Sequence, residues 1–358
     1  MSNSVVSELT TTVQFNCHVS DARHGADDSL CVYLMRMREY YRWEKGLPYG
    51  SCLERDAVGE WLQSREQLWE ELETATLRPI EIGGERFDPF DADAINRRLT
   101  PHGLVYGGGL GNRAKPHFVL GTLERETTQD AHHVLVVARE LARDLTAPAA
   151  MTRGHTIVVR RESLRRTLWE KLETWRWNRP DNALGRAFAC DDFDGSLERA
   201  LDAMTEREMA TLLWHEQGEA EAGQCLGEEW NELLMACIAT PAELVARAVR
   251  DHLADCFITL PALAKGGHEA SLHLYIGNLG GMRKHLFPAL QTAYEEWRAT
   301  GEPTSFLTAA EHGRAHWMQV AEEFLALYRA SGPDAADAIH GLVERIRLAP
   351  AAHGIRSS

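Results

Sequence analysis

Three histidine–carboxylate pairs, each separated by about one helical turn, are the residues of this chain best suited by type and spacing to chemistry. The pairs are His215 with Glu219, His252 with Asp255, and Glu269 with His273. Their neighbours in the sequence are mostly apolar, which predicts that each pair is buried. A buried imidazole beside a buried carboxylate is costly unless the two pair with each other or hold a metal ion together.

Metal binding is the first interpretation of these six residues. Nitrogen and oxygen ligands without thiolate suit iron, manganese or zinc, and we expect iron first. Helical proteins build such sites from carboxylates and histidines that project from adjacent helices. Further candidate ligands lie on the same helical stripe as His215, in an amino-terminal helix, and in a turn-rich segment before that helix; these are Glu208, Glu39, His18 and His24.

In their histidines and carboxylates on successive predicted helices, residues 205–286 resemble the helical carboxylate–histidine non-haem iron and di-iron oxidases. These include ferritin-like and haem-oxygenase-like enzymes. The resemblance implies metal ligands among the pairs and Glu208, dioxygen as a co-substrate and a small molecule as the substrate. Ferritin-like proteins space their ligands as Glu-x-x-His, whereas Glu269 and His273 are four residues apart. The spacing therefore does not fix the number of metal ions.

A second interpretation is a non-catalytic helical protein that binds a partner or small ligand. In that case each acid only holds a core histidine in one orientation. The sequence leaves both interpretations open, and they differ in whether the three histidine-bearing helices meet at one point. The nearby HEQGE string is not a zinc-peptidase motif, because Glu219 stands where the second histidine of HExxH would be.

The helices and strands expected from the sequence, which must position these residues, indicate a mainly α protein of the α+β class. Short β-branched runs punctuated by Gly, Pro and Asp indicate a small antiparallel β subdomain inserted in the N-terminal third of a helical protein. Helical periodicity with proline boundaries dominates the remainder. The expected organisation is a helical segment over 1–78, the β subdomain over 79–160, a helical domain over 161–348 and a disordered tail over 349–358.

Composition narrows the class of partner. The 358 residues carry 53 acidic and 38 basic side chains, a formal net charge of -15. Nucleic acid and anionic membranes both select basic surfaces, so neither is expected as a partner. No run approaches 18 apolar residues, which argues against a membrane-spanning helix.

The seven cysteines are odd in number and scattered, as is typical of reduced thiols in the cytoplasm. The sequence predicts no oligomeric state.

Overall fold

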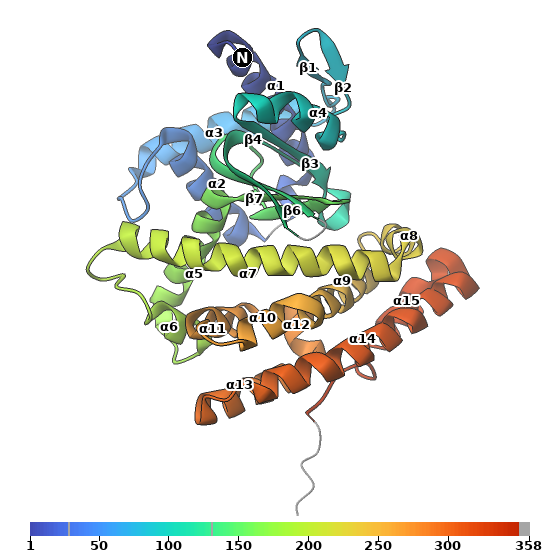
Figure 1. Cartoon of the computed structure of the whole chain (residues 1–358). Coiled ribbons are helices and arrows are strands. Elements are labelled where there is room, and N and C mark those ends of the chain that lie inside the picture. Colours follow the sequence, from blue (N-terminus) through green and yellow to red (C-terminus); the bar gives the residue numbers. More distant parts are fainter. Residues whose placement is uncertain (28, 130–131, 351–358) are drawn as a thin grey trace, which may run out of the picture. The chain divides into compact units, whose positions relative to one another are not determined.

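The computed structural model describes residues 1–27, 29–129 and 132–350, and it divides the chain into two compact units (Figure 1). The first unit consists of Met1–Glu173 and Asp192–Met209, and the second of Thr174–Asp191 and Ala210–Ser358. Helices α5 (Arg161–Asn178) and α7 (Leu197–Leu226) each contribute residues to both units. Of the expected disordered tail, residues 351–358 lie outside the described part of the chain.

Helices surround a curved sheet in the first unit. Besides the start of α5 and α7, they are α1 (Asn3–His24), η1 (Gly25–Asp27), α2 (Leu30–Lys45), α3 (Arg55–Leu72), α4 (Ala92–Leu99), η2 (Thr100–His102) and η3 (Asn112–Ala114). Helix α1 is continuous through His18 and His24, so the expectation of a turn-rich segment there was wrong. Its apolar residues Leu9, Val13 and Cys17 are buried and belong to the same core cluster as residues of the sheet.

Two separate sheets form in the first unit. Strands β1 (Ile80–Ile82) and β2 (Glu85–Phe87) make the small antiparallel pair expected in this region. The larger sheet has five strands in the order β3-β4-β5-β7-β6. Its strands are β3 (Leu104–Leu110), β4 (Pro116–Gln129), β5 (His132–Arg143), β6 (Ala150–Arg153) and β7 (Thr156–Arg160).

The five-stranded sheet is mixed, which corrects the expectation of an antiparallel subdomain alone. Strand β7 pairs in parallel with β5, with Val136 opposite Val159, and antiparallel with β6. In the β6–β7 hairpin, the second strand, β7, therefore lies next to β5, and the first strand, β6, lies at the edge of the sheet. The alternation of apolar residues identifies strands but does not reveal such an order. Register shifts between Leu120 and Arg125 accompany the curvature of the sheet.

All regular elements described in the second unit are helices, as the sequence predicts. In addition to parts of α5 and α7 they are α6 (Ala183–Phe188), α8 (Glu228–Ala236), α9 (Pro241–Ala254), the π-helix η4 (Asp255–Thr259), α10 (Leu260–Ala264), α11 (Glu269–Asn278), α12 (Gly281–Leu286), α13 (Pro288–Thr300), α14 (Thr304–Ser331), η5 (Gly332–Asp334) and α15 (Ala335–Gly341). Within the described residues, none of the helices has the length and apolar character that a bilayer span requires.

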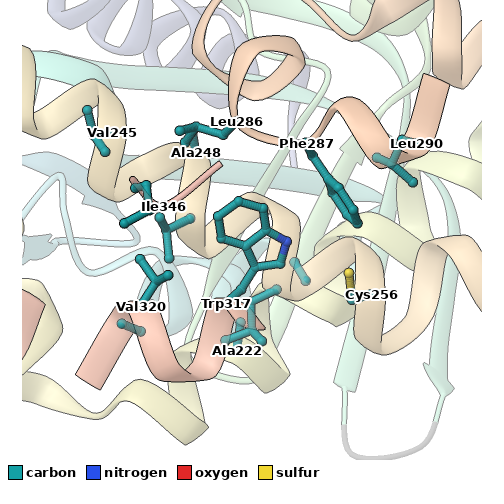
Figure 2. Packing of buried hydrophobic residues seen from close by; sticks show 14 of the residues in the cluster. Ala222, Val245, Ala248, Cys256, Leu286, Phe287, Leu290, Trp317, Val320 and Ile346 are labelled. Carbon is teal, nitrogen blue, oxygen red and sulfur yellow. The ribbon is translucent and has the colours of Figure 1, made fainter. Parts of the chain in front are cut away.

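The core of the second unit centres on Trp317 of α14, which has no exposed surface (Figure 2). Figure 2 shows Val245 and Ala248 of α9, Phe287 and Cys256 around the indole. The Phe287 ring meets the indole edge-on, with centroids 5.5 Å apart. This packing fixes α9 against α14 and so orients the residues that α9 carries on its other faces.

Candidate metal centre

Helices α7 and α9 approach so closely at Gly218 that no other residue fits there. A Cβ atom at Gly218 would lie 2.4 Å from the carbonyl oxygen of Ala254, far inside van der Waals contact. Ala254 is the last residue of α9, and the π-helix η4 begins at the next residue, Asp255. Single π turns inside helices occur frequently at functional sites. The close approach brings His215 and Glu219, one turn apart on α7, against the end of α9.

The imidazole of His215 is held by Asp255. The Nδ1–H of His215 donates to Asp255 Oδ1 at 2.8 Å. The other carboxylate oxygen accepts a hydrogen bond from the Tyr275 hydroxyl at 2.8 Å and pairs with the Arg283 guanidinium. Because Nδ1 is engaged, Nε2 is the ring atom that faces Glu219, and it lies 3.6 Å from Glu219 Oε1.

His215, Glu219 and Asp251 form a set of ligand atoms that lie within 4.8 Å of one another. A metal ion at about 2.1 Å from nitrogen and oxygen ligands places neighbouring ligand atoms roughly 3 Å apart. Small side-chain rotations therefore suffice to enclose an ion. The three side chains keep 22–23 % of their surface exposed, whereas that of Asp255 keeps 1 %. Asp255 is thus suited to orient His215, and the other two acids are suited to bind.

Two arginines balance the carboxylates. Arg250 Nη2 is 3.2 Å from both oxygens of Glu219, and Arg283 Nε is 3.9 Å from Asp251 Oδ2. Burial alone would raise the pKa of Asp255, but Arg283 and His215 hold it well below the ordinary range. Burial and the nearby Glu219 raise the pKa of Asp251. Burial also opposes ionisation of Glu219, but Arg250 and His215 bring its pKa below the usual value.

The surroundings of His215 favour its protonated form. Burial acts to lower its pKa, but the Asp255 carboxylate and the hydrogen bond to it raise the pKa to about 9. The extra proton resides on Nε2, the atom that lies 3.6 Å from Glu219 Oε1. The proton therefore occupies the position from which the ring would bind a metal ion.

His252 lies on a different face of α9 from Asp251 and Asp255. It is one residue beyond Asp251, about 100° around the helix, and this rotation turns it into the core. Its Nε2–H donates to the Arg283 carbonyl at 2.9 Å, and its ring stacks on Trp317 with centroids 5.0 Å apart. Burial lowers its pKa to about 3, so the ring is neutral.

His273 and Glu269 are also separate from this cluster. His273 Nδ1 is 2.8 Å from the Tyr294 hydroxyl, and its ring meets Trp297 edge-on. Glu269 is exposed at the start of α11. Helix α11 instead contributes Tyr275 to the cluster, because Tyr275 follows His273 by two residues and so points to nearly the opposite side of the helix. The expectation that all three pairs converge is therefore wrong: His215, Glu219 and Asp255 meet, and the other three residues do not join them.

The reserve candidates all belong to the first unit. Glu39 is buried and pairs with Arg38 and Arg42 at 2.7 and 3.3 Å. His18 lies 2.9 Å from Arg65, and His24 lies 3.1 Å from Asp27. Glu208 lies on α7 beside Arg207, before the point where that helix enters the second unit. None of them is part of the cluster around His215.

Sequence reasoning missed Asp251, Arg250, Arg283 and Tyr275. One signal was available for Asp251, because it precedes Asp255 by four residues and so shares its helix face. The two arginines and the tyrosine carry no comparable signal, since only the tertiary packing of α9, α11 and α12 brings them to the carboxylates.

The chain is thus an α+β protein with a mixed-sheet unit and a helical unit that carries a histidine–carboxylate cluster. It belongs to the family of unknown function DUF6866: the model of the N-terminal domain matches residues 8–160, and that of the C-terminal domain matches residues 165–346. Comparison with curated proteins and with solved structures gives no match. The resemblance to ferritin-like and haem-oxygenase-like oxidases was wrong, because the family is a different one and the fold includes the curved mixed sheet.

Proposed function

We propose that the helical unit binds one divalent transition-metal ion through His215 Nε2, Glu219 and Asp251. The observation that carries this proposal is the orientation of His215: its Nδ1–H is fixed by a buried carboxylate, its Nε2 lies 3.6 Å from Glu219, and Asp251 completes the set of ligand atoms. Metal-binding histidines characteristically donate their second ring N–H to a carboxylate or carbonyl, which fixes the tautomer and increases the basicity of the ligand.

Asp255 supports the site without binding the ion. Its oxygens are already occupied by His215, Tyr275 and Arg283. Glu219 and Asp251 are more exposed: they hydrogen-bond to each other, and each has one arginine at 3.2 Å or more. The ion would replace the proton on His215. This proton would be released to solvent when the ion binds.

Iron is the first candidate, with manganese and zinc as the alternatives, because the ligands are nitrogen and oxygen without thiolate. One histidine and two carboxylates leave several coordination positions for water or a small-molecule substrate. We propose oxidation of a small molecule as the reaction class, with iron as the bound ion. We place this chemistry in the cytoplasm, in line with the seven free cysteines, all within the described residues.

A second candidate function has one specific observation in its favour. Arg250, Arg283 and protonated His215 already supply three positive charges against the three carboxylates, so the cluster is a balanced ionic network without any ion. In that case the network would specify how α7, α9 and α12 pack, and the protein would be a non-catalytic binding protein. This function predicts loss of stability in variants of the cluster and no effect of metal ions.

Metal analysis of the full chain, purified without a histidine tag, separates the two functions. The metal site predicts close to one equivalent of iron, manganese or zinc, or uptake of one equivalent from added Fe²⁺ under anaerobic conditions. Asp251→Asn should lower this content, and the matched exposed variant Asp337→Asn should not. Less than about a tenth of an equivalent, with no rise in melting temperature on adding metal, would refute the metal site.

A further inference from the structure

A cavity of about 450 Å³ lies in the second unit, and α13, α14 and residues 348–350 contribute most of its walls. Its volume is within the range of about 300–1,000 Å³ that is usual for small-molecule sites. The described residues that line it include none of the cluster around His215. The cavity is therefore a feature separate from the candidate metal centre.

Small side chains on two adjacent helices leave this space. Ala289 and Ala293 lie one turn apart on α13, Ala309 lies on α14, and all three line the cavity. Phe287 lines it as well, and its buried ring also meets the Trp317 indole edge-on (Figure 2). The cavity thus reaches the apolar core of the unit. Because alanine ends at Cβ, the two helices do not interlock fully here, and larger side chains would fill the space.

Hydrogen bonds between the elements fix the walls of the cavity. The N–H of Leu348 donates to the Leu286 carbonyl at 2.8 Å, and the N–H of Ala289 donates to the Leu348 carbonyl at 3.2 Å. The Ser305 hydroxyl, near the start of α14, donates to the Ala293 carbonyl of α13 at 2.9 Å. A ligand that enters such a preformed cavity does not have to order the chain around it, which favours binding.

Polar side chains make up the less buried part of the lining. They recur at intervals of four residues on each helix, and this spacing puts each set on one helical face. On α13 they are Thr292, Glu296 and Thr300, and on α14 they are Thr304, Thr308 and His312. None of these six is buried, whereas Phe287, Ala293 and Ala309 are. The cavity therefore has an apolar inner wall and a hydrophilic rim.

The charged side chains of the rim are acidic. Glu296 and Glu302 both line the cavity, and no lysine or arginine occurs among the described residues that do. His312 is the lining residue that can become positively charged. Arg298, also on α13, pairs with Glu295 at 2.8 Å and does not line the cavity. The charge of the rim therefore suits a cationic group and disfavours an anionic one.

We propose that this cavity binds a small molecule that carries a protonated amine on an apolar body. An ammonium group has three hydrogen-bond donors and no acceptor, so it suits the carboxyl groups of Glu296 and Glu302 and the threonine hydroxyls of the rim. The apolar body packs against Phe287 and the alanines of the inner wall, which removes its surface from water. This proposal goes beyond the metal site and does not depend on it.

The test is isothermal titration calorimetry of the full chain, with a chelator present, against three probes of equal chain length: hexylamine, 1-hexanol and hexanoate. Hexylamine should bind with one equivalent and about two- to tenfold more tightly than 1-hexanol, because each exposed ion pair contributes modestly. Hexanoate should bind more weakly than both. Absence of saturable hexylamine binding would refute the proposal, and so would an affinity for 1-hexanol or hexanoate that equals or exceeds that for hexylamine.

Two pairs of matched variants locate the bound amine. Ala293→Leu fills the cavity and should abolish hexylamine binding, whereas Ala299→Leu, at an exposed position of α13 outside the cavity, should retain it. Glu296→Gln should reduce the preference for hexylamine over 1-hexanol, whereas Glu295→Gln, which removes the same charge one residue away, should not. Equal behaviour of the two glutamine variants would refute the cavity as the site, and this comparison remains decisive even if Ala293→Leu fails to fold.

Discussion

Asp255 Oδ1 lies 2.8 Å from Nδ1 of His215, although the two residues are 40 positions apart in the chain. This hydrogen bond joins the first turn of a π-helix to the middle of α7. It determines which ring nitrogen of His215 faces Glu219 and Asp251, and it sets the charge of the ring. The chemistry proposed for the helical unit depends on this contact.

Metal affinity should rise with pH up to about pH 9. The ligand is neutral His215, and the pKa of its protonated form is about 9. Below that pH the metal must displace a proton, so the apparent affinity falls by roughly tenfold for each unit of pH. Isothermal titration calorimetry at pH 6, 7 and 8 in buffers of different ionisation enthalpy measures both the affinity and the protons released. An affinity that is constant over this range would contradict Nε2 of His215 as a ligand.

Asp255→Asn should weaken metal binding by about 10- to 100-fold, the usual effect of losing a partner of a metal-bound histidine. The amide keeps the shape of the side chain but removes the charge that holds His215 and Arg283. Because Arg283 then lacks its buried counter-ion, the free energy of unfolding should also fall, by about 3–5 kcal/mol. Chemical denaturation and metal titration measure the two effects, with Asp337→Asn as the exposed control. Unchanged metal affinity would exclude Asp255 as the residue that orients His215.

The helical unit was predictable because its helices carry periodic apolar residues and proline boundaries. Helix α1 was not, since Asn16, Ser20 and Asp21 are buried in it and obscure the apolar face. They are tolerated there because they have polar partners in other elements: Asn16 bonds to the backbone of Arg78, Ser20 to the Pro116 carbonyl and Asp21 to Lys115. Such tertiary partners are not visible in the local sequence.

The candidate site was predictable only in part, for a related reason. The i,i+4 spacing correctly put His215 and Glu219 on one face, but spacing does not show which face meets which neighbouring helix. The approach at Gly218 selects Asp251 and Asp255 from α9 and turns His252 toward Trp317. A glycine in the middle of a helix, between two candidate ligands, was the one local sign of that approach.

Gly218→Ala should therefore disrupt the site without removing any polar group. The added Cβ would lie 2.4 Å from the Ala254 carbonyl, and backbone cannot move aside cheaply. We expect α7 and α9 to separate, with a loss of about 1–3 kcal/mol in unfolding free energy and weaker metal binding. Gly223→Ala, on the same helix, is the matched control: its Cβ meets nothing within 4 Å, so it should stabilise by about 0.5–1 kcal/mol. Similar effects of the two substitutions would contradict the close approach.

His252 should govern stability in acid but not metal binding. Burial holds its pKa near 3 in the folded protein, against an ordinary value of 6.5, so the unfolded chain binds the extra proton between these pH values. Stability is therefore complete above about pH 6.5 and falls as the pH drops toward 3, by up to about 1.4 kcal/mol per pH unit. His18, whose pKa burial also lowers to about 3, contributes in the same direction.

Denaturation curves from pH 4 to 7 give the slope of the unfolding free energy against pH. This slope should be smaller for His252→Gln than for wild type, by the equivalent of about one proton. The variant should keep its full metal content, since His252 bonds to the Arg283 carbonyl and stacks on Trp317. Loss of metal together with an unchanged pH slope would instead make His252 a ligand and contradict the assignment of His215, Glu219 and Asp251 alone.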